Sequence, residues 1–289
     1  GTETDCAGGV RSHGRRDHGR GHGQRASGGS TTNNLTMTTK TTSNLWAIAP
    51  RALATIAASM KEAREPGAML TMADFVVARP GATIDEGGTG HVHIQGALGD
   101  KMPNIWGMLG NTDYRQLRAE IEGAKASGAE NLAIHIDTPG GMVSGLEEAG
   151  DAIAQAAESM NVTAYVDGMA CSAGYYLACQ ADQIVASPSS EVGNIGTVMA
   201  WADDNPAWEA MGVEFHVMTN EGADLKGTFR DSPMTDSQRE FLQEQLNEHG
   251  AAFRATVEGN RPNIDAEVFR AGWYSGEKAI SLGLIDTVS

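Results

Sequence analysis

Short apolar segments alternate with longer amphipathic segments along the chain from His91 onward. Helical spacing of apolar positions predicts helices at about 112–127, 143–160, 172–181 and 201–211, and a long helix over 235–261 that begins at Thr235. The segments with the length and pattern of β-strands are 91–98, 131–137, 162–168, 183–188 and 213–219. Strands that alternate with such helices favour an α/β fold of βα repeats with a mostly parallel sheet.

The N-terminal part of the chain has a different character. Residues 1–45 are rich in Gly, Ser, Thr and Asn and hold almost no aliphatic side chains, which predicts a disordered leader. Residues 46–62 form an apolar stretch that is too short for a membrane anchor and indicates an amphipathic helix. A glycine-rich run over 81–90 reads as a linker. We therefore expect a leader over 1–45, a helix and linker over 46–89, and one globular domain over 90–289.

Charge and cysteine content narrow the function classes. The chain has 37 Asp and Glu against 21 Lys and Arg, and its formal net charge of -16 leaves no uniform basic face for nucleic acid. Its three cysteines, Cys6, Cys171 and Cys179, form no CxxC pair and no zinc spacing. We therefore expect no disulfide framework, no metal site and no cofactor. A reducing, cytoplasmic compartment fits this cysteine pattern best.

The first candidate for chemistry is the run DTPGG at residues 137–141, which lies between a predicted strand and a predicted helix. Ligands bind at such strand ends in parallel sheets, and two glycines let main-chain N–H groups approach a bound oxygen closely. The alternative is a plain glycine turn that opens a helix.

The second candidate is the run MACSAGYY at residues 169–176, which again follows a strand and opens a helix. A serine among small residues at a helix start suits a nucleophile, because a substrate carbonyl can come close and the helix amides can stabilise its oxyanion. The alternative is that Ser172 only caps the helix. Gly141 and Ser172 are 31 residues apart, the spacing of consecutive βα units, so the two runs can face one crevice.

A nucleophilic serine needs a general base, and the sequence offers few suitable histidines for this role. His135 and His216 both fall inside apolar strand patterns, and no histidine lies between them. Only Lys226 and Lys278 follow Ser172 among the lysines. Lys226 lies in a polar, glycine-bearing loop, whereas Lys278 has the setting of a solvated surface residue. A lysine can act as general base when burial favours its neutral form. The alternative for Lys226 is an exposed loop cation.

These runs, together with GNIGTV at 193–198 and the later loop lysine, occur in an order that resembles the signal peptide peptidase A (protease IV) family of Ser-Lys serine peptidases. The resemblance covers about residues 90–288 and includes the closing run GWYSGEKAISLGLID. It implies a Clp-protease/crotonase-like fold with Ser172 as nucleophile and Lys226 as general base. It also implies an oxyanion hole formed by the amides of Ala173, Gly140 and Gly141.

Two positions depart from the family pattern. Ala173 stands where family members usually have glycine, which leaves the main-chain N–H in place. Asn194 stands where the family has a serine that helps to orient the lysine, and its carbonyl oxygen offers Lys226 an acceptor instead. The loop before Lys226 is slightly longer than in typical members, so the alignment of this lysine depends on there being no other lysine nearby.

The resemblance also implies partners. Shorter members without an anchor are encoded by phages and prophages, where they cleave scaffold, portal or capsid proteins, so we expect a procapsid maturation protease in the host cytoplasm or the procapsid interior. A homo-oligomer is implied by the same resemblance. The alternatives are a soluble bacterial signal-peptide-peptidase-like protease, a crotonase-type acyl-CoA enzyme, and a non-catalytic assembly protein of the same fold.

Overall fold

The computed structural model describes residues 46–48, 79–103, 107, 110–201, 203–226 and 234–289. The leader expected over 1–45, and all but three residues of the helix expected over 46–62, lie outside this part of the chain. The three described residues of that stretch, Trp46–Ile48, form a strand and not a helix, because they pair with residues 140–142. The helices are α3 (Tyr114–Ala126), α4 (Leu146–Ala157), α5 (Ala173–Ala178), α6 (Asn205–Ala210), α7 (Asp236–Asn260), α8 (Gly276–Ser281) and a 3-10 helix (Ala266–Arg270). The strands are β1 (Trp46–Ile48), β2 (Thr83–Ile84), β3 (Thr89–Gly99), β4 (Thr112–Asp113), β5 (Asn131–Met142), β6 (Asn161–Cys171), β7 (Gln183–Ala186), β8 (Glu191–Gly193), β9 (Trp273–Ser275) and β10 (Thr287–Val288).

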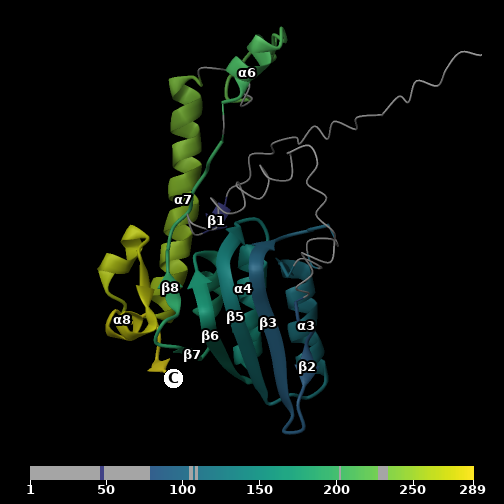
Figure 1. The fold of residues 1–289 in the computed structure, drawn as a ribbon, viewed down its shortest axis with the longest axis vertical. Coiled ribbons are helices and arrows are strands. Elements are labelled where there is room, and N and C mark those ends of the chain that lie inside the picture. The colour runs from purple at the N-terminus through teal and green to yellow at the C-terminus, as the bar shows by residue number, and fades with distance from the viewer. Residues whose placement is uncertain (1–45, 49–78, 104–106, 108–109, 202, 227–233) are drawn as a thin grey trace, which may run out of the picture. The chain divides into compact units, whose positions relative to one another are not determined.

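A sheet with the strand order β10-β7-β6-β5-β3-β2 organises the described residues (Figure 1). Neighbouring strands from β10 to β3 are parallel, and β2 is antiparallel to β3 at the edge. The short strand β8 lies parallel beside the end of β6, and β9 pairs with β8 in the antiparallel sense. The α/β fold with repeated strand and helix units is therefore confirmed.

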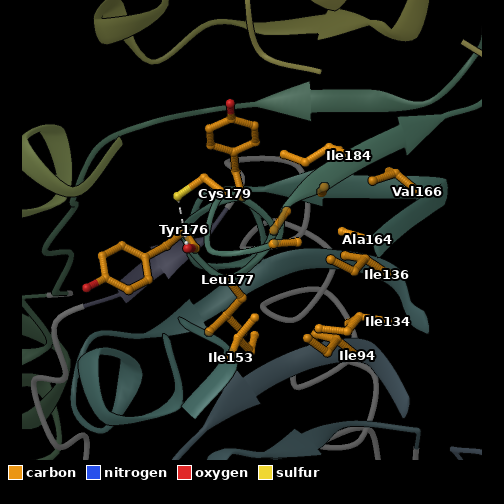
Figure 2. Close-up of a cluster of buried hydrophobic side chains, with 14 of the residues drawn as sticks. Ile94, Ile134, Ile136, Ile153, Ala164, Val166, Tyr176, Leu177, Cys179 and Ile184 are labelled. Carbon is orange, nitrogen blue, oxygen red and sulfur yellow. Dashed lines mark hydrogen bonds between the residues drawn. The ribbon is translucent and has the colours of Figure 1, made fainter. Parts of the chain in front are cut away.

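The core lies between the sheet and helices α3, α4 and α5. Strands β3, β5 and β6 alternate, so that every second side chain is buried on the face that these helices cover. Each large aliphatic side chain buried in this way contributes about 1.5–3 kcal/mol. Figure 2 shows part of the cluster, which includes Ile94, Ile134, Ile136, Ile153, Ala164, Val166, Leu177 and Ile184.

The opposite face of the sheet carries a stack of rings across β3, β5 and β6. His135 stacks on His93 with ring centroids 4.8 Å apart, on His91 at 5.4 Å and on Tyr165 at 5.7 Å. Burial, followed by repulsion between the imidazoles, lowers the pKa of His93 and of His135 below the ordinary histidine value. His135 is thus a partly buried sheet residue, as its strand pattern suggests.

Three local expectations differ from the structure. The strand expected over 131–137 continues to Met142, because Gly140 and Gly141 pair with β3 on one side and with the distant strand β1 on the other. The expected linker 81–90 contains β2, which folds back on β3. The expected strand over 213–219 is not a strand.

Helix ends are predicted more accurately. The side chain of Thr235 accepts a hydrogen bond from the main-chain N–H of Gln238, and the Gln238 side chain accepts one from the N–H of Thr235. This capping box starts α7 where the sequence places it. The helix expected over 201–211 is shorter and spans Asn205–Ala210.

Candidate active site

Ser172 sits in a sharp turn between β6 and α5. Its backbone angles are φ 55° and ψ −119°, a region that residues with a Cβ atom rarely occupy. The N–H of Ser172 donates to the carbonyl of Gly193 at 2.8 Å, which ties the turn to the end of β8. A strained serine between a strand and a helix is the geometry of a nucleophile elbow.

The capping alternative for Ser172 fails, because its side chain makes no hydrogen bond to the start of α5. Its Oγ instead points to the carbonyl oxygen of Gly196, at a long 3.4 Å. The hydroxyl is therefore only weakly engaged. Ser172 is also 0% exposed, so a substrate reaches it only if covering residues move.

Ala173 begins α5 directly after the serine and is buried. Within the described residues its N–H donates to no acceptor, as expected for the first residue of a helix. A buried N–H beside a nucleophile can receive a developing oxyanion. Ala173 therefore has a free main-chain donor next to Ser172 among the described residues.

The DTPGG run lies directly beside this turn, as expected. Thr138 of β5 is the register partner of Ala170 in β6. A Cβ atom on Gly174 would lie 2.4 Å from the Cγ2 of Thr138, so α5 starts in contact with β5 only because residue 174 is glycine. The two runs singled out in the sequence are therefore brought together.

The two glycines of the run are held by different neighbours. The N–H of Gly140 donates to Oγ1 of Thr138 at 3.0 Å, so this amide already has a partner within the chain. Thr138 Oγ1 in turn donates to the carbonyl of Gly96 at 2.5 Å. A Cβ atom on Gly141 would lie 2.0 Å from the carbonyl oxygen of Leu98, which leaves no space for any side chain. The hydroxyl of Thr138 thus links Gly96 of β3 to Gly140, a contact that the sequence did not reveal.

Asn194 is buried and turned toward the C-terminal segment. Its main-chain N–H donates to the carbonyl of Gly272 at 2.7 Å, and its Nδ2 donates to the carbonyl of Ala271 at 3.1 Å. These two bonds hold the loop whose Gly193 and Gly196 carbonyls face Ser172. Through these bonds Asn194 stabilises the loop that contacts the turn at Ser172.

Lys226 is exposed and is not brought to Ser172. Its N–H donates to the carbonyl of Ala223 at 3.0 Å, and no hydrogen bond joins it to Ser172 in the part of the chain that the structure describes. His216 is also exposed and lies 3.7 Å from the Glu214 carboxylate. Lys278 is an exposed residue of α8, as its sequence setting suggests.

The remaining polar chemistry of the described residues is limited. No three His, Cys, Asp or Glu side chains among them are arranged to hold a metal ion. In the same part of the chain, no helix is long and apolar enough to cross a membrane. Cys179 is fully buried, and burial raises the pKa of its thiol to about 12.

Comparison with known families gives a match in the C-terminal part of the chain. The model of peptidase family S49 matches residues 154–289. This S49 segment contains both Ser172 and Lys226, whereas the DTPGG run precedes it.

Individual S49-like relatives include phage and bacterial proteins. The capsid assembly protease C of Escherichia phage lambda is 29% identical over 197 residues, covering 67% of this chain and 44% of its own. The probable protease SohB of Haemophilus influenzae is 27% identical over 217 residues, covering 73% of this chain and 58% of its own. The chain thus spans about half the length of these curated relatives. Among solved structures, a membrane-bound stomatin-specific protease is 17% identical and aligns with a TM-score of 0.40 over 68% of this chain and 74% of that one.

Proposed function

We propose that this chain is a serine endopeptidase in which Ser172 is the nucleophile and Lys226 is the general base. The observation that carries the proposal is the turn at Ser172, where a strained backbone presents a hydroxyl that caps no helix. The unoccupied N–H of Ala173 beside it and the S49 family of the segment support the same reading. The proposed peptidase domain spans 90–289, with β1 and β2 adding to its sheet.

The proposed reaction has two halves. Neutral Lys226 takes the proton of Ser172 Oγ, which attacks the peptide carbonyl carbon, and the carbonyl oxygen becomes an oxyanion. The N–H groups of Ala173 and of Gly140 or Gly141 receive this charge. When the C–N bond breaks, the leaving amine takes the proton from Lys226 and an acyl-enzyme remains. Water then gives a proton to Lys226 and attacks the ester carbon. The ester C–O bond breaks, Ser172 Oγ takes this proton from Lys226, and the new carboxylic acid leaves, so that serine and neutral lysine are restored.

Two rearrangements are part of this proposal. Lys226 must move from its exposed position to Ser172 when substrate binds, because no hydrogen bond joins the two among the described residues. Gly140 must release Thr138 Oγ1 if its N–H is to receive the oxyanion. Catalytic hydrogen bonds commonly form only in the substrate complex. Moving a lysine out of water also favours the neutral amine that a base requires.

The proposed substrates are proteins of phage assembly. The similarity to a phage capsid assembly protease favours scaffold, portal or capsid proteins as substrates, cleaved in the host cytoplasm or inside the procapsid. The similarity to SohB supports a bacterial protease as the second candidate. In either case the ligand is an extended polypeptide.

Incubation with purified scaffold, portal and capsid proteins, followed by sequencing of new termini, tests the function. Wild type should generate defined termini, and Ser172→Ala should generate none. Lys226→Arg should lower the rate by about 100-fold or more, because arginine keeps the charge but does not accept a proton in this pH range. Lys278→Arg is the matched control and should cleave like wild type.

A fluorophosphonate probe separates the enzyme from the other candidates. An active serine peptidase should be labelled at Ser172, whereas an acyl-CoA enzyme or an inert assembly protein of the same fold does not require this labelling. Cleavage by Ser172→Ala at the wild-type rate would refute the role of Ser172 as nucleophile. Full activity of Lys226→Arg would refute the role of Lys226 as general base.

A further inference from the structure

Thr138 lies at an irregularity of the sheet, directly beside the turn at Ser172. Two residues of β5, Thr138 and Pro139, oppose the single residue Gly96 of β3, because the register between these strands shifts there. The register between β5 and β6 also shifts directly before Thr138. Such a two-against-one arrangement is a β-bulge, a feature that often re-aims groups next to active sites. Since Pro139 also has no N–H to donate, main-chain pairing alone holds this part of β5 less firmly than the residues before it.

The Thr138 hydroxyl bridges this bulge. Its Oγ1 donates its only hydrogen to the carbonyl of Gly96 at 2.5 Å and accepts the N–H of Gly140 at 3.0 Å. Because the hydrogen is committed to Gly96, the lone pairs of Oγ1 are left for Gly140. Gly140 has φ 107°, a conformation that favours glycine, and no side chain fixes its amide by packing. The direction of this N–H therefore depends on Thr138.

The methyl group of Thr138 contacts the segment that follows Ser172. A Cβ atom on Gly174 would lie 2.4 Å from Thr138 Cγ2, so the methyl group packs against the start of α5. Gly174 follows Ala173, whose N–H is the other proposed oxyanion donor. Thr138 is 0% exposed, so these contacts are shielded from water. One buried side chain thus touches both segments that carry the proposed donors.

We propose that Thr138 is a positioning residue of the oxyanion hole, an inference that rests on the proposed peptidase reaction. Its hydroxyl aims the N–H of Gly140, and its methyl group sets the spacing between that donor and the N–H of Ala173. When the substrate carbonyl oxygen gains charge, the Gly140 N–H changes partner from the neutral hydroxyl to the oxyanion, which is the stronger acceptor. Until then the hydroxyl keeps this buried donor satisfied and correctly directed.

Two substitutions separate the hydroxyl from the methyl group. Thr138→Val keeps the size and the methyl contact but removes the acceptor for the Gly140 N–H. Thr138→Ser keeps the hydroxyl and removes the methyl group. Thr112 provides the matched control, because it is also 0% exposed and its hydroxyl donates to the carbonyl and accepts from the N–H of Gln95, each at 2.9 Å. Thr112→Val therefore loses one donated and one accepted main-chain bond, as Thr138→Val does, and neither bond involves the DTPGG run or α5.

Labelling kinetics with a fluorophosphonate probe test the positioning role. Ser172 Oγ bonds to phosphorus, its proton passes to the base and fluoride leaves, while the phosphoryl oxygen occupies the oxyanion hole. Thr138→Val should lower the maximal labelling rate about 30-fold but change the half-saturating probe concentration less than about twofold, because a misdirected donor weakens the transition state and not the binding of the probe. Thr138→Ser should stay within about fivefold of the wild-type rate, and Thr112→Val should label like wild type.

Hydrogen exchange measures the same contact without any reaction. In the Ser172→Ala background, the amide of Gly140 should exchange about tenfold faster in Thr138→Val, because it has lost its acceptor. The same amide should keep its slow exchange in Thr138→Ser and in Thr112→Val. Mass spectrometry with electron-transfer fragmentation resolves this single amide.

The outcomes separate this inference from the proposed function. A wild type that is not labelled at Ser172 overturns both. A labelled wild type with an unchanged rate in Thr138→Val, or with equal losses in Thr138→Val and Thr112→Val, overturns the positioning role alone. Circular dichroism checks that each variant is folded. If Thr138→Val is unfolded, Thr138→Ala, whose smaller side chain fits the same space, carries the same prediction for the hydroxyl.

Discussion

Replacing Ser172 by glycine and by alanine measures the strain of the candidate nucleophile. At φ 55° and ψ −119°, a residue with a Cβ atom bears a cost of about 1–3 kcal/mol. Glycine escapes this cost but loses about 0.5–1 kcal/mol through its greater freedom in the unfolded chain. Both variants lose the hydroxyl, whose 3.4 Å contact with Gly196 is too long to matter much. Ser172→Gly should therefore be more stable than Ser172→Ala by about 1 kcal/mol.

Urea unfolding followed by tryptophan fluorescence measures this difference. In a thermal melt the same difference is about 2–4 °C for a domain of this size. Ser237 provides the control, because it lies in the first turn of α7 with ordinary helical geometry. There the order should reverse, with the glycine variant less stable than the alanine variant by about 0.5–1 kcal/mol. If Ser172→Gly is the less stable variant at position 172 as well, the turn is not strained and the argument for a nucleophile elbow fails.

Three further predictions concern groups away from the serine. Cys179, with its thiol pKa raised to about 12, should resist iodoacetamide at pH 8 in the folded chain and react in urea, as peptide mapping will show. The lowered pKa values of His93 and His135 mean that the unfolded chain binds more protons, so the free energy of unfolding should fall as pH drops below about 6.5, less so in His135→Gln. Arg261 Nη1 lies 2.9 Å from both carboxylate oxygens of Asp286. Asp286→Ala should lower the free energy of unfolding in urea by about 2 kcal/mol, less than for a fully buried pair because the carboxylate is partly exposed. An unchanged free energy of unfolding would show that the pair is not formed.

The parts of the fold that the sequence predicts well are those with a local cause. The capping box at Thr235 lies within four consecutive residues, and the alternation in β3 is visible within the strand itself. The extension of β5 to Met142 depends instead on pairing with β3 and with β1, which lies some 90 residues earlier in the chain. Thr138 is a similar case, since its hydroxyl links Gly96 and Gly140 only after two strands have paired. Long-range pairing is the information that a local pattern lacks.

This difference between local and long-range causes also explains why the structure supports Ser172 of the proposed dyad better than it supports Lys226. Ser172 is fixed by its neighbours in sequence, because the strand before it and the small residues after it force one turn, which β8 then braces. The proposed role of Lys226 needs a contact across 54 residues, and among the described residues no hydrogen bond joins Lys226 to the serine. Local sequence therefore accounts for the strained turn at Ser172, whereas the position of the proposed base depends on long-range interactions that a local pattern does not contain.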